Sequence, residues 1–173
     1  MKTIVIYTSQ TGFTKRYAQW IAETSGADCL ALSAAKKKNL DAYDTIIFGG
    51  WACAGGISGL GWFKNKLPKW SGKKLIAFCV GASPMDSPEI EPALRRNFTD
   101  LERERISVFY CPGGLNYEKM PAPSRLMMKI FVRTLKAKKN KTEMDREMIK
   151  MLSDSYDISD RKYIEPILDI ISG

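Results

Sequence analysis

The chain has 173 residues, 45% of them hydrophobic and 27% charged, and its 27 Lys and Arg against 19 Asp and Glu give a formal net charge of +8. This length and composition are typical of one folded domain and exclude a disordered or fibrous chain. There is no histidine, which excludes Ser-His-Asp and Cys-His catalysis and histidine-ligated zinc. Chemistry must therefore come from a bound cofactor, from carboxylates, lysines, tyrosines or thiols, or from the backbone.

Short apolar runs alternate with helical patterns along the chain, which predicts an α/β fold with a parallel sheet and crossover helices. The first run, 3–8 (TIVIYT), is β-branched and almost wholly apolar, as expected of a central strand buried on both faces. Five strands are predicted, at 3–8, 27–32, 44–49, 74–80 and 106–111.

Helices are predicted between and after these strands, at 13–24, 59–67, 88–103, 124–138, 142–153 and 160–171. The third should begin sharply, because Ser87 is a good N-cap, Pro88 suits the first helical position and Glu89 lies at the positive helix end. No second domain is indicated. We expect a single domain spanning 1–173, with a basic helical insertion or extension at about 116–150.

The cysteines are widely spaced and form no CxxC pair. Cys29, Cys79 and Cys111 lie within predicted strands, where a free thiol behaves as a small buried hydrophobe. We therefore expect reduced thiols and a cytoplasmic protein. No run of 18 apolar residues exists, so no membrane-spanning segment is expected, and peripheral contact with the inner face of a membrane remains an option.

The most informative segment is YTSQTGFT, residues 7–14, between the first strand and the first helix. At such a turn, backbone N–H groups and the positive helix end face outward beyond the strand. Four hydroxyl side chains accompany Gly12: Thr8, Ser9, Thr11 and Thr14. A simple helix cap needs only one of them, so this concentration favours a site where uncharged donors surround a phosphate dianion.

The pattern Y-x-S-x-T-G-x-T resembles the phosphate-binding motif of flavodoxins, with Phe13 where flavodoxins commonly carry Asn. The resemblance extends across nearly the whole chain. It implies FMN as cofactor and a flavodoxin-like three-layer sandwich, with a five-stranded parallel sheet of order 2-1-3-4-5. By this resemblance the phosphate is held by Ser9, Gln10, Thr11, Gly12, Phe13 and Thr14.

Two further loops are expected to frame the flavin ring. By the resemblance, a glycine peptide after the third strand reorients toward reduced flavin, and Gly55 and Gly56 supply that freedom. Trp51 is a candidate to stack on the ring, with a partly buried core position as the alternative. Cys53 is interpreted as a small neighbour of the ring, because no cation or second cysteine lies nearby in sequence. The residues expected at the ring are Gly50, Trp51, Ala52, Cys53, Ala54, Gly55, Gly81, Ala82, Ser83 and Pro84.

Between 119 and 150 there are ten basic residues and three acidic ones. Arg125, Lys129, Arg133 and Lys136 form one helical stripe, and the remaining positions are largely apolar. A basic amphipathic helix suits an anionic membrane surface, so 124–139 is a candidate docking segment. The alternative is a core-packed helix with a solvated basic edge. No nucleic acid partner is expected, because no binding motif is present.

The stretches GGLNYEKM and SRLMMKIF resemble the flavodoxin-like quinone-dependent protoporphyrinogen dehydrogenases. This implies an FMN-binding oxidoreductase that acts with a quinone or another redox partner. The chemistry would be carried by the flavin, so no catalytic side chain and no metal site are expected. Two alternatives remain: an electron carrier with a basic docking face, and a non-enzymatic module that binds anions or a membrane surface.

Overall fold

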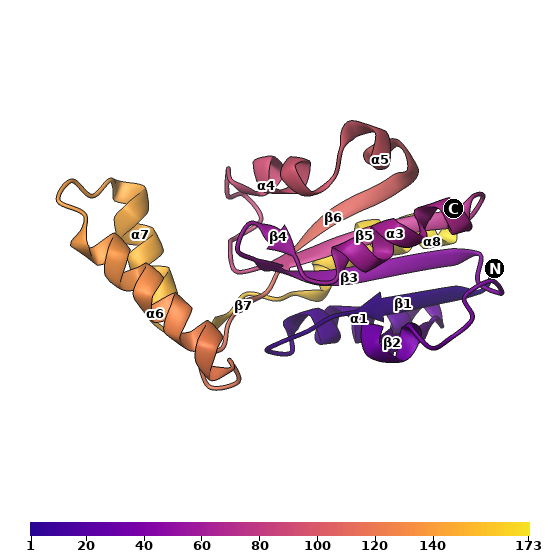
Figure 1. Ribbon diagram of the computed structural model, residues 1–173, viewed down its shortest axis with the longest axis horizontal. Coiled ribbons are helices and arrows are strands. Elements are labelled where there is room, and N and C mark those ends of the chain that lie inside the picture. The colour runs from indigo at the N-terminus through magenta and orange to yellow at the C-terminus, as the bar shows by residue number, and fades with distance from the viewer.

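The structure is a computed structural model that describes residues 1–173. Five parallel strands lie side by side in the order β2-β1-β3-β5-β6 (Figure 1). Their bounds are β1 (Thr3–Tyr7), β2 (Asp28–Ala31), β3 (Thr45–Cys53), β5 (Lys74–Gly81) and β6 (Ile106–Pro112). This confirms the predicted sheet order, to which the structure adds a short antiparallel strand on β3, β4 (Gly56–Ile57).

Helices cover both faces of this sheet, because consecutive apolar strand residues point to opposite sides. Val5 packs against α1 (Phe13–Ser25) and α8 (Glu165–Ser172), whereas Ile4 and Ile6 pack on the other face. That second face is covered by α2 (Leu32–Ala35), α3 (Leu60–Lys66) and the 3-10 helix η1 (Leu67–Trp70). The three-layer sandwich is therefore confirmed. The predicted last helix begins as the 3-10 helix η2 (Arg161–Ile164) and continues as α8.

The prediction of a single helix at 88–103 is wrong. The structure has α4 (Ile90–Asn97) and α5 (Asp100–Arg105), with Glu89 rather than Ser87 preceding the first. Between them, Phe98 is extended and only 2% exposed. Thr99 then starts α5 by accepting a hydrogen bond from the Glu102 N–H in a capping box. Burial of the Phe98 ring and a new cap therefore interrupt a pattern that looked continuous.

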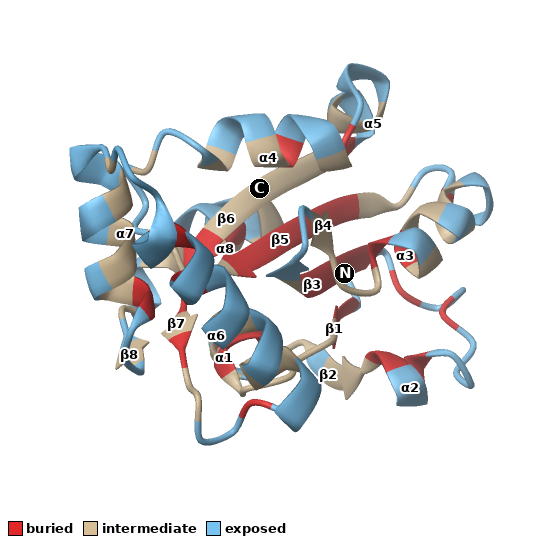
Figure 2. Ribbon diagram, turned by 60° about the vertical axis from the view of Figure 1, so that its left-hand side comes forward, coloured by how far each residue is buried: buried red, intermediate tan, exposed pale blue.

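A pair of helices, α6 (Ala122–Ala137) and α7 (Glu143–Leu152), lies beyond the carboxyl ends of the strands (Figure 1). It has a small apolar cluster of its own, made by Leu115, Met120, Val132, Leu135 and Leu152. A two-stranded sheet of β7 (Gly114–Leu115) and β8 (Tyr156–Asp157) joins the two ends of this segment to the main sheet. Most of the outer surface of α6 is exposed (Figure 2). None of the helices is long and apolar enough to cross a bilayer.

Candidate functional site

The loop of residues 8–14, called the 8–14 loop below, follows β1 and opens α1. Gly12 precedes the helix in a left-handed conformation, with φ 105° and ψ −17°, and no side chain caps the first turn. Its N–H donates to Ser9 Oγ at 3.1 Å. The N–H groups of Thr11, Phe13 and Thr14 have no acceptor within the protein. The loop thus presents several free donors at a positive helix end, as an anion requires.

The hydroxyl groups of this loop divide into two kinds. Thr14 is 1% exposed as a residue and lines the cavity described below. The hydroxyl of Thr8 donates to the Ser58 carbonyl at 3.0 Å, so it secures the fold rather than facing an anion, contrary to the sequence interpretation. With its free backbone N–H groups at the positive end of α1, the loop fits the phosphate of FMN.

The end of β3 and strand β4 form a β-hairpin where the sequence predicted a loop from residue 49. Ala52 pairs with Ile57 and Cys53 pairs with Gly56, leaving a two-residue turn. Both turn residues have positive φ, 47° at Ala54 and 81° at Gly55, as a type I′ turn requires. This hairpin, referred to as the 52–57 hairpin, lines the same cavity as the 8–14 loop.

A cavity of about 200 Å³, the central cavity, lies between the 8–14 loop, the 52–57 hairpin and the end of β5. It brings together most of the residues expected at the flavin: Ser9, Gln10, Thr11, Phe13, Thr14, Trp51, Ala52, Cys53, Ala54, Gly81 and Ala82. Its lining contains no Asp, Glu, Lys or Arg. Trp51 is partly exposed there. An apolar space with a few uncharged polar groups suits a flavin ring.

The remaining expected residues lie around this cavity. Gly12 lines an open groove on the outer side of the 8–14 loop. Gly55 and Ser83 line a neighbouring pocket of about 180 Å³, between the hairpin and α4. Gly50 lies behind the hairpin, where an added Cβ would come within 2.5 Å of Ile57. Pro84 lines neither the cavity nor the neighbouring pocket.

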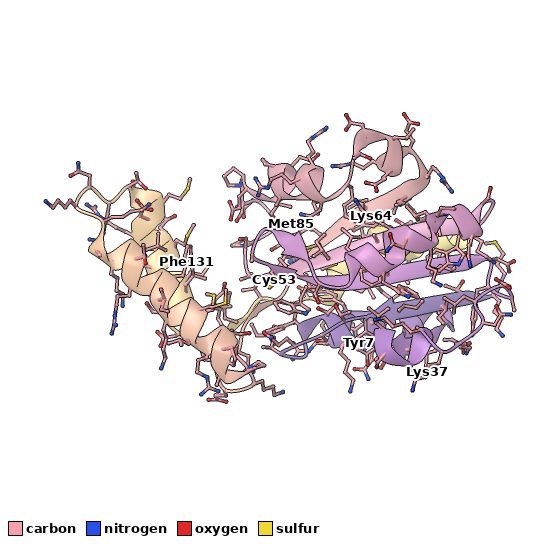
Figure 3. All side chains as sticks on the ribbon, viewed as in Figure 1. Tyr7, Lys37, Cys53, Lys64, Met85 and Phe131 are labelled. Atoms are coloured by element: carbon pink, nitrogen blue, oxygen red, sulfur yellow. The ribbon has the colours of Figure 1, made fainter.

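The segment before and within α6 supplies a wall of the central cavity that the sequence interpretation missed. Its lining residues are Asn116, Met120, Ser124, Met127 and Met128. In Figure 3, Cys53 lies at the end of the sheet that faces α6, and Phe131 lies on the side of α6 toward that end. The methionines were visible in sequence only as part of an amphipathic helix. Nothing local indicated which of its faces would meet the flavin loops.

The four cysteines are free thiols with different exposure. Cys53 is exposed and Cys29 is half-buried, whereas Cys79 and Cys111 are buried. Burial raises the pKa of Cys79 to about 12 and also raises that of Cys111. These two thiols are consequently unreactive packing groups at neutral pH.

The sequence matches the family model of the flavodoxin domain over residues 4–145. The chain therefore belongs to the flavodoxin-domain family. Together with the fold and the central cavity, this membership defines an FMN-binding, flavodoxin-like redox protein. No curated protein matches the chain.

Several solved structures are similar to this chain at low identity and with TM-scores below 0.5. A flavodoxin from the domain Archaea is 17% identical, with a TM-score of 0.42, over 88% of this chain and 97% of that one. Flavodoxin 1 from Bacillus cereus is 16% identical, with a TM-score of 0.43, over 80% and 99%. The rubredoxin oxygen:oxidoreductase of Desulfovibrio gigas is 14% identical, with a TM-score of 0.43, over 99% of this chain but only 37% of that one.

Proposed function

We propose that the protein is an FMN-dependent oxidoreductase that transfers electrons from a protoporphyrinogen-like substrate to a quinone. Each transfer removes two electrons and two protons from the substrate and delivers them to the quinone, which becomes the quinol. Bound FMN supplies this two-electron chemistry. The observation that carries the proposal is the apolar wall of Met120, Met127 and Met128 beside the flavin loops, since flexible thioethers adapt to large flat apolar molecules.

In this proposal the chain binds and orients while the cofactor reacts. Residues 9–14 hold the phosphate through backbone N–H groups and hydroxyls, and residues 51–54 with Gly81 and Ala82 frame the ring. The cavity offers no carboxylate, ammonium or guanidinium group. Protons therefore pass between the substrate, the quinone and solvent without a charged side chain of the protein. The segment 116–150 is proposed to be an insertion in a single flavodoxin-like domain.

We further propose that residues 124–139 dock on an anionic membrane surface. A groove of about 680 Å³, the basic groove, runs along α6 and is lined by Arg125, Lys129, Arg133 and Lys136, together with Glu118 and Asp154. None of the four cations forms an ion pair. An exposed apolar stripe lies beside them, made by Leu126, Met127, Ile130 and Phe131. Apolar insertion flanked by cations is the usual basis of interfacial binding.

A turnover assay tests whether the protein is an oxidoreductase. Purified protein loaded with FMN is mixed with protoporphyrinogen and menadione, and porphyrin formation is followed by absorbance. Multiple turnovers that need both FMN and the quinone support the proposal. Reduction of bound FMN by other donors without any turnover would instead favour the electron carrier with a basic docking face. Protein that binds no added FMN would favour the non-enzymatic module.

Sedimentation with liposomes tests the docking. Wild-type protein should pellet with vesicles containing phosphatidylglycerol at low salt and be released by salt, because exposed charges are screened. The double variant Lys129→Glu/Arg133→Glu should remain in the supernatant. The matched control is Lys36→Glu/Lys37→Glu, which makes the same charge change on two adjacent exposed residues. Of these, Lys37 is labelled in Figure 3 and lies far from α6. Equal loss of binding in both variants would indicate only a general effect of net charge and would contradict docking through α6.

A further inference from the structure

Three successive carbonyl groups at the end of β5 are all held by donors of the protein. Gly81 O accepts from the Gly113 N–H at 2.8 Å. Ala82 O accepts from the Tyr156 hydroxyl at 2.6 Å, and Ser83 O accepts from the Tyr110 hydroxyl at 2.8 Å. The N–H groups of Ala82 and Ser83, by contrast, have no acceptor within the protein. This stretch, called the 81–83 turn, therefore offers donors rather than acceptors to its surroundings.

The two tyrosines come from different parts of the fold. Tyr110 lies in β6, and its hydroxyl would be 2.6 Å from a Cβ at Gly81, so only glycine leaves room for it there. Tyr156 lies in β8, after the α6–α7 segment, and is placed by pairing with Leu115 of β7. Gly114 permits this pairing, since an added Cβ would lie 2.1 Å from the Tyr156 carbonyl oxygen. Strand β8, which follows the α6–α7 segment, thus reaches the 81–83 turn beside the central cavity.

Both hydroxyls remain protonated donors throughout the neutral range. Burial raises the pKa of Tyr156 to about 12, and burial also raises the pKa of Tyr110. Neither tyrosine lines the central cavity, whereas Gly81 and Ala82 do. The side chains can therefore influence a bound ring only through the backbone that they hold.

We propose that Tyr156 is a positioning residue for the flavin: by holding the Ala82 carbonyl, together with Tyr110 on the next carbonyl, it fixes the 81–83 turn so that N–H donors face the ring. The inference rests on the proposed flavin site. Reduced FMN carries a negative charge at neutral pH, and preorganised donors stabilise such charge more than they stabilise the neutral oxidised ring. Loss of the Tyr156 hydrogen bond allows the Ala82 carbonyl to turn toward the ring. This weakens the binding of reduced flavin more than the binding of oxidised flavin.

The test compares Tyr156→Phe with Tyr117→Phe in the full chain. Tyr117 is the matched control, because its hydroxyl also donates to a backbone carbonyl in the same segment, that of Leu152, at 2.5 Å. FMN binding is measured by quenching of flavin fluorescence, and the midpoint potential of bound FMN by dye equilibration. The Kd of Tyr156→Phe should rise by about 2- to 10-fold, as for one lost hydrogen bond. Its midpoint potential should become more negative, and Tyr117→Phe should match the wild type in both measurements.

The outcomes separate this inference from the function on which it rests. Wild-type protein that does not bind FMN overturns both. Wild-type protein that binds FMN, with Tyr156→Phe indistinguishable from Tyr117→Phe in Kd and potential, overturns the positioning role alone, as do equal shifts in both variants. Urea unfolding establishes that each variant folds. If Tyr156→Phe does not fold, Tyr110→Phe decides, with the same expected shifts and the same overturning result.

Discussion

Gln10 Nε2 donates a hydrogen bond of 3.0 Å to Ser124 Oγ, which joins the 8–14 loop to the first turn of α6. A second connection nearby is the ion pair of Arg16 in α1 with Asp157 in β8. The segment from α6 to β8 is thus attached to the 8–14 loop at one end and to α1 at the other. Because binding free energies at coupled sites are reciprocal, FMN loading and contacts of α6 should each influence the other.

The first prediction concerns the Gln10–Ser124 contact. Ser124→Ala removes the acceptor and should weaken the attachment of α6 by about 1 kcal/mol, the net value of one hydrogen bond. Trypsin cleavage within 119–150 of the native protein should then accelerate by about fivefold, because proteolysis follows the population of the open form. Thr134→Ala is the control, since that hydroxyl bonds only to the Ile130 carbonyl of its own helix. Equal cleavage rates in both variants would contradict the role of the contact.

The second prediction separates backbone strain from FMN binding at the two glycines that flank α1. Gly12 and Gly26 precede and follow α1 with φ of 105° and 70°, and an added Cβ would meet nothing within 4 Å at either. Replacement of either by Ala should therefore cost about 1–2 kcal/mol through backbone strain alone. Only Gly12→Ala should also raise the Kd for FMN, by about tenfold or more, because relief of its strain redirects the free N–H groups of the loop. Urea unfolding and FMN titration measure the two effects, and unchanged FMN affinity in Gly12→Ala would place the phosphate elsewhere.

The third prediction uses the exposed thiol in the lining of the central cavity. A thiol reagent such as DTNB should modify Cys53 first, while Cys79 and Cys111 react only on unfolding. FMN bound in the cavity should slow the reaction of Cys53 at least about fivefold, an effect equivalent to about 1 kcal/mol. The rate at half-buried Cys29, in β2, should be unaffected and serves as the internal control. If saturating FMN leaves the Cys53 rate unchanged, the flavin ring does not contact the 52–57 hairpin.

Local sequence patterns were sufficient for the sheet and for the 8–14 loop. A buried strand such as 3–8 can be recognised from its own β-branched and apolar residues. The hydroxyl side chains and Gly12 of the 8–14 loop follow it directly in sequence. The hairpin at 52–57 was harder to predict because the run of small residues that it contains carries no alternation of polar and apolar side chains. The break at Phe98 was missed because the burial of one ring outweighed a continuous helical pattern.

The rest of the site depends on contacts between residues far apart in the sequence. Tyr156 reaches Ala82 across 74 positions and Gln10 reaches Ser124 across 114. No periodicity or spacing encodes such partners. For the same reason, the face of α6 that lines the central cavity could not be distinguished in sequence from the face that the small apolar cluster buries.

The last prediction is a pH dependence at the β8 attachment. Burial acts to raise the pKa of Asp157, but hydrogen bonds from Arg16 and Ser159 outweigh it and hold the value below the ordinary 3.8. A carboxyl whose pKa is depressed in the folded protein contributes stability that is complete above its unfolded pKa. That contribution is lost as the pH falls through the folded value. Asp157→Asn should therefore lower the free energy of unfolding at pH 6, and its difference from the wild type should shrink as the pH falls below 3.8.

Urea unfolding of wild type and Asp157→Asn between pH 2 and pH 6 measures this difference, at roughly half-unit steps so that the transition of a single carboxyl is resolved. Asp154→Asn is the control, because Asp154 lies in the same segment and forms no ion pair. Both side chains of the Arg16–Asp157 pair remain partly exposed, so added salt should also reduce the effect at pH 6. A difference that stays constant across this pH range would mean that Asp157 stabilises β8 through its shape and neutral hydrogen bonds rather than through its charge.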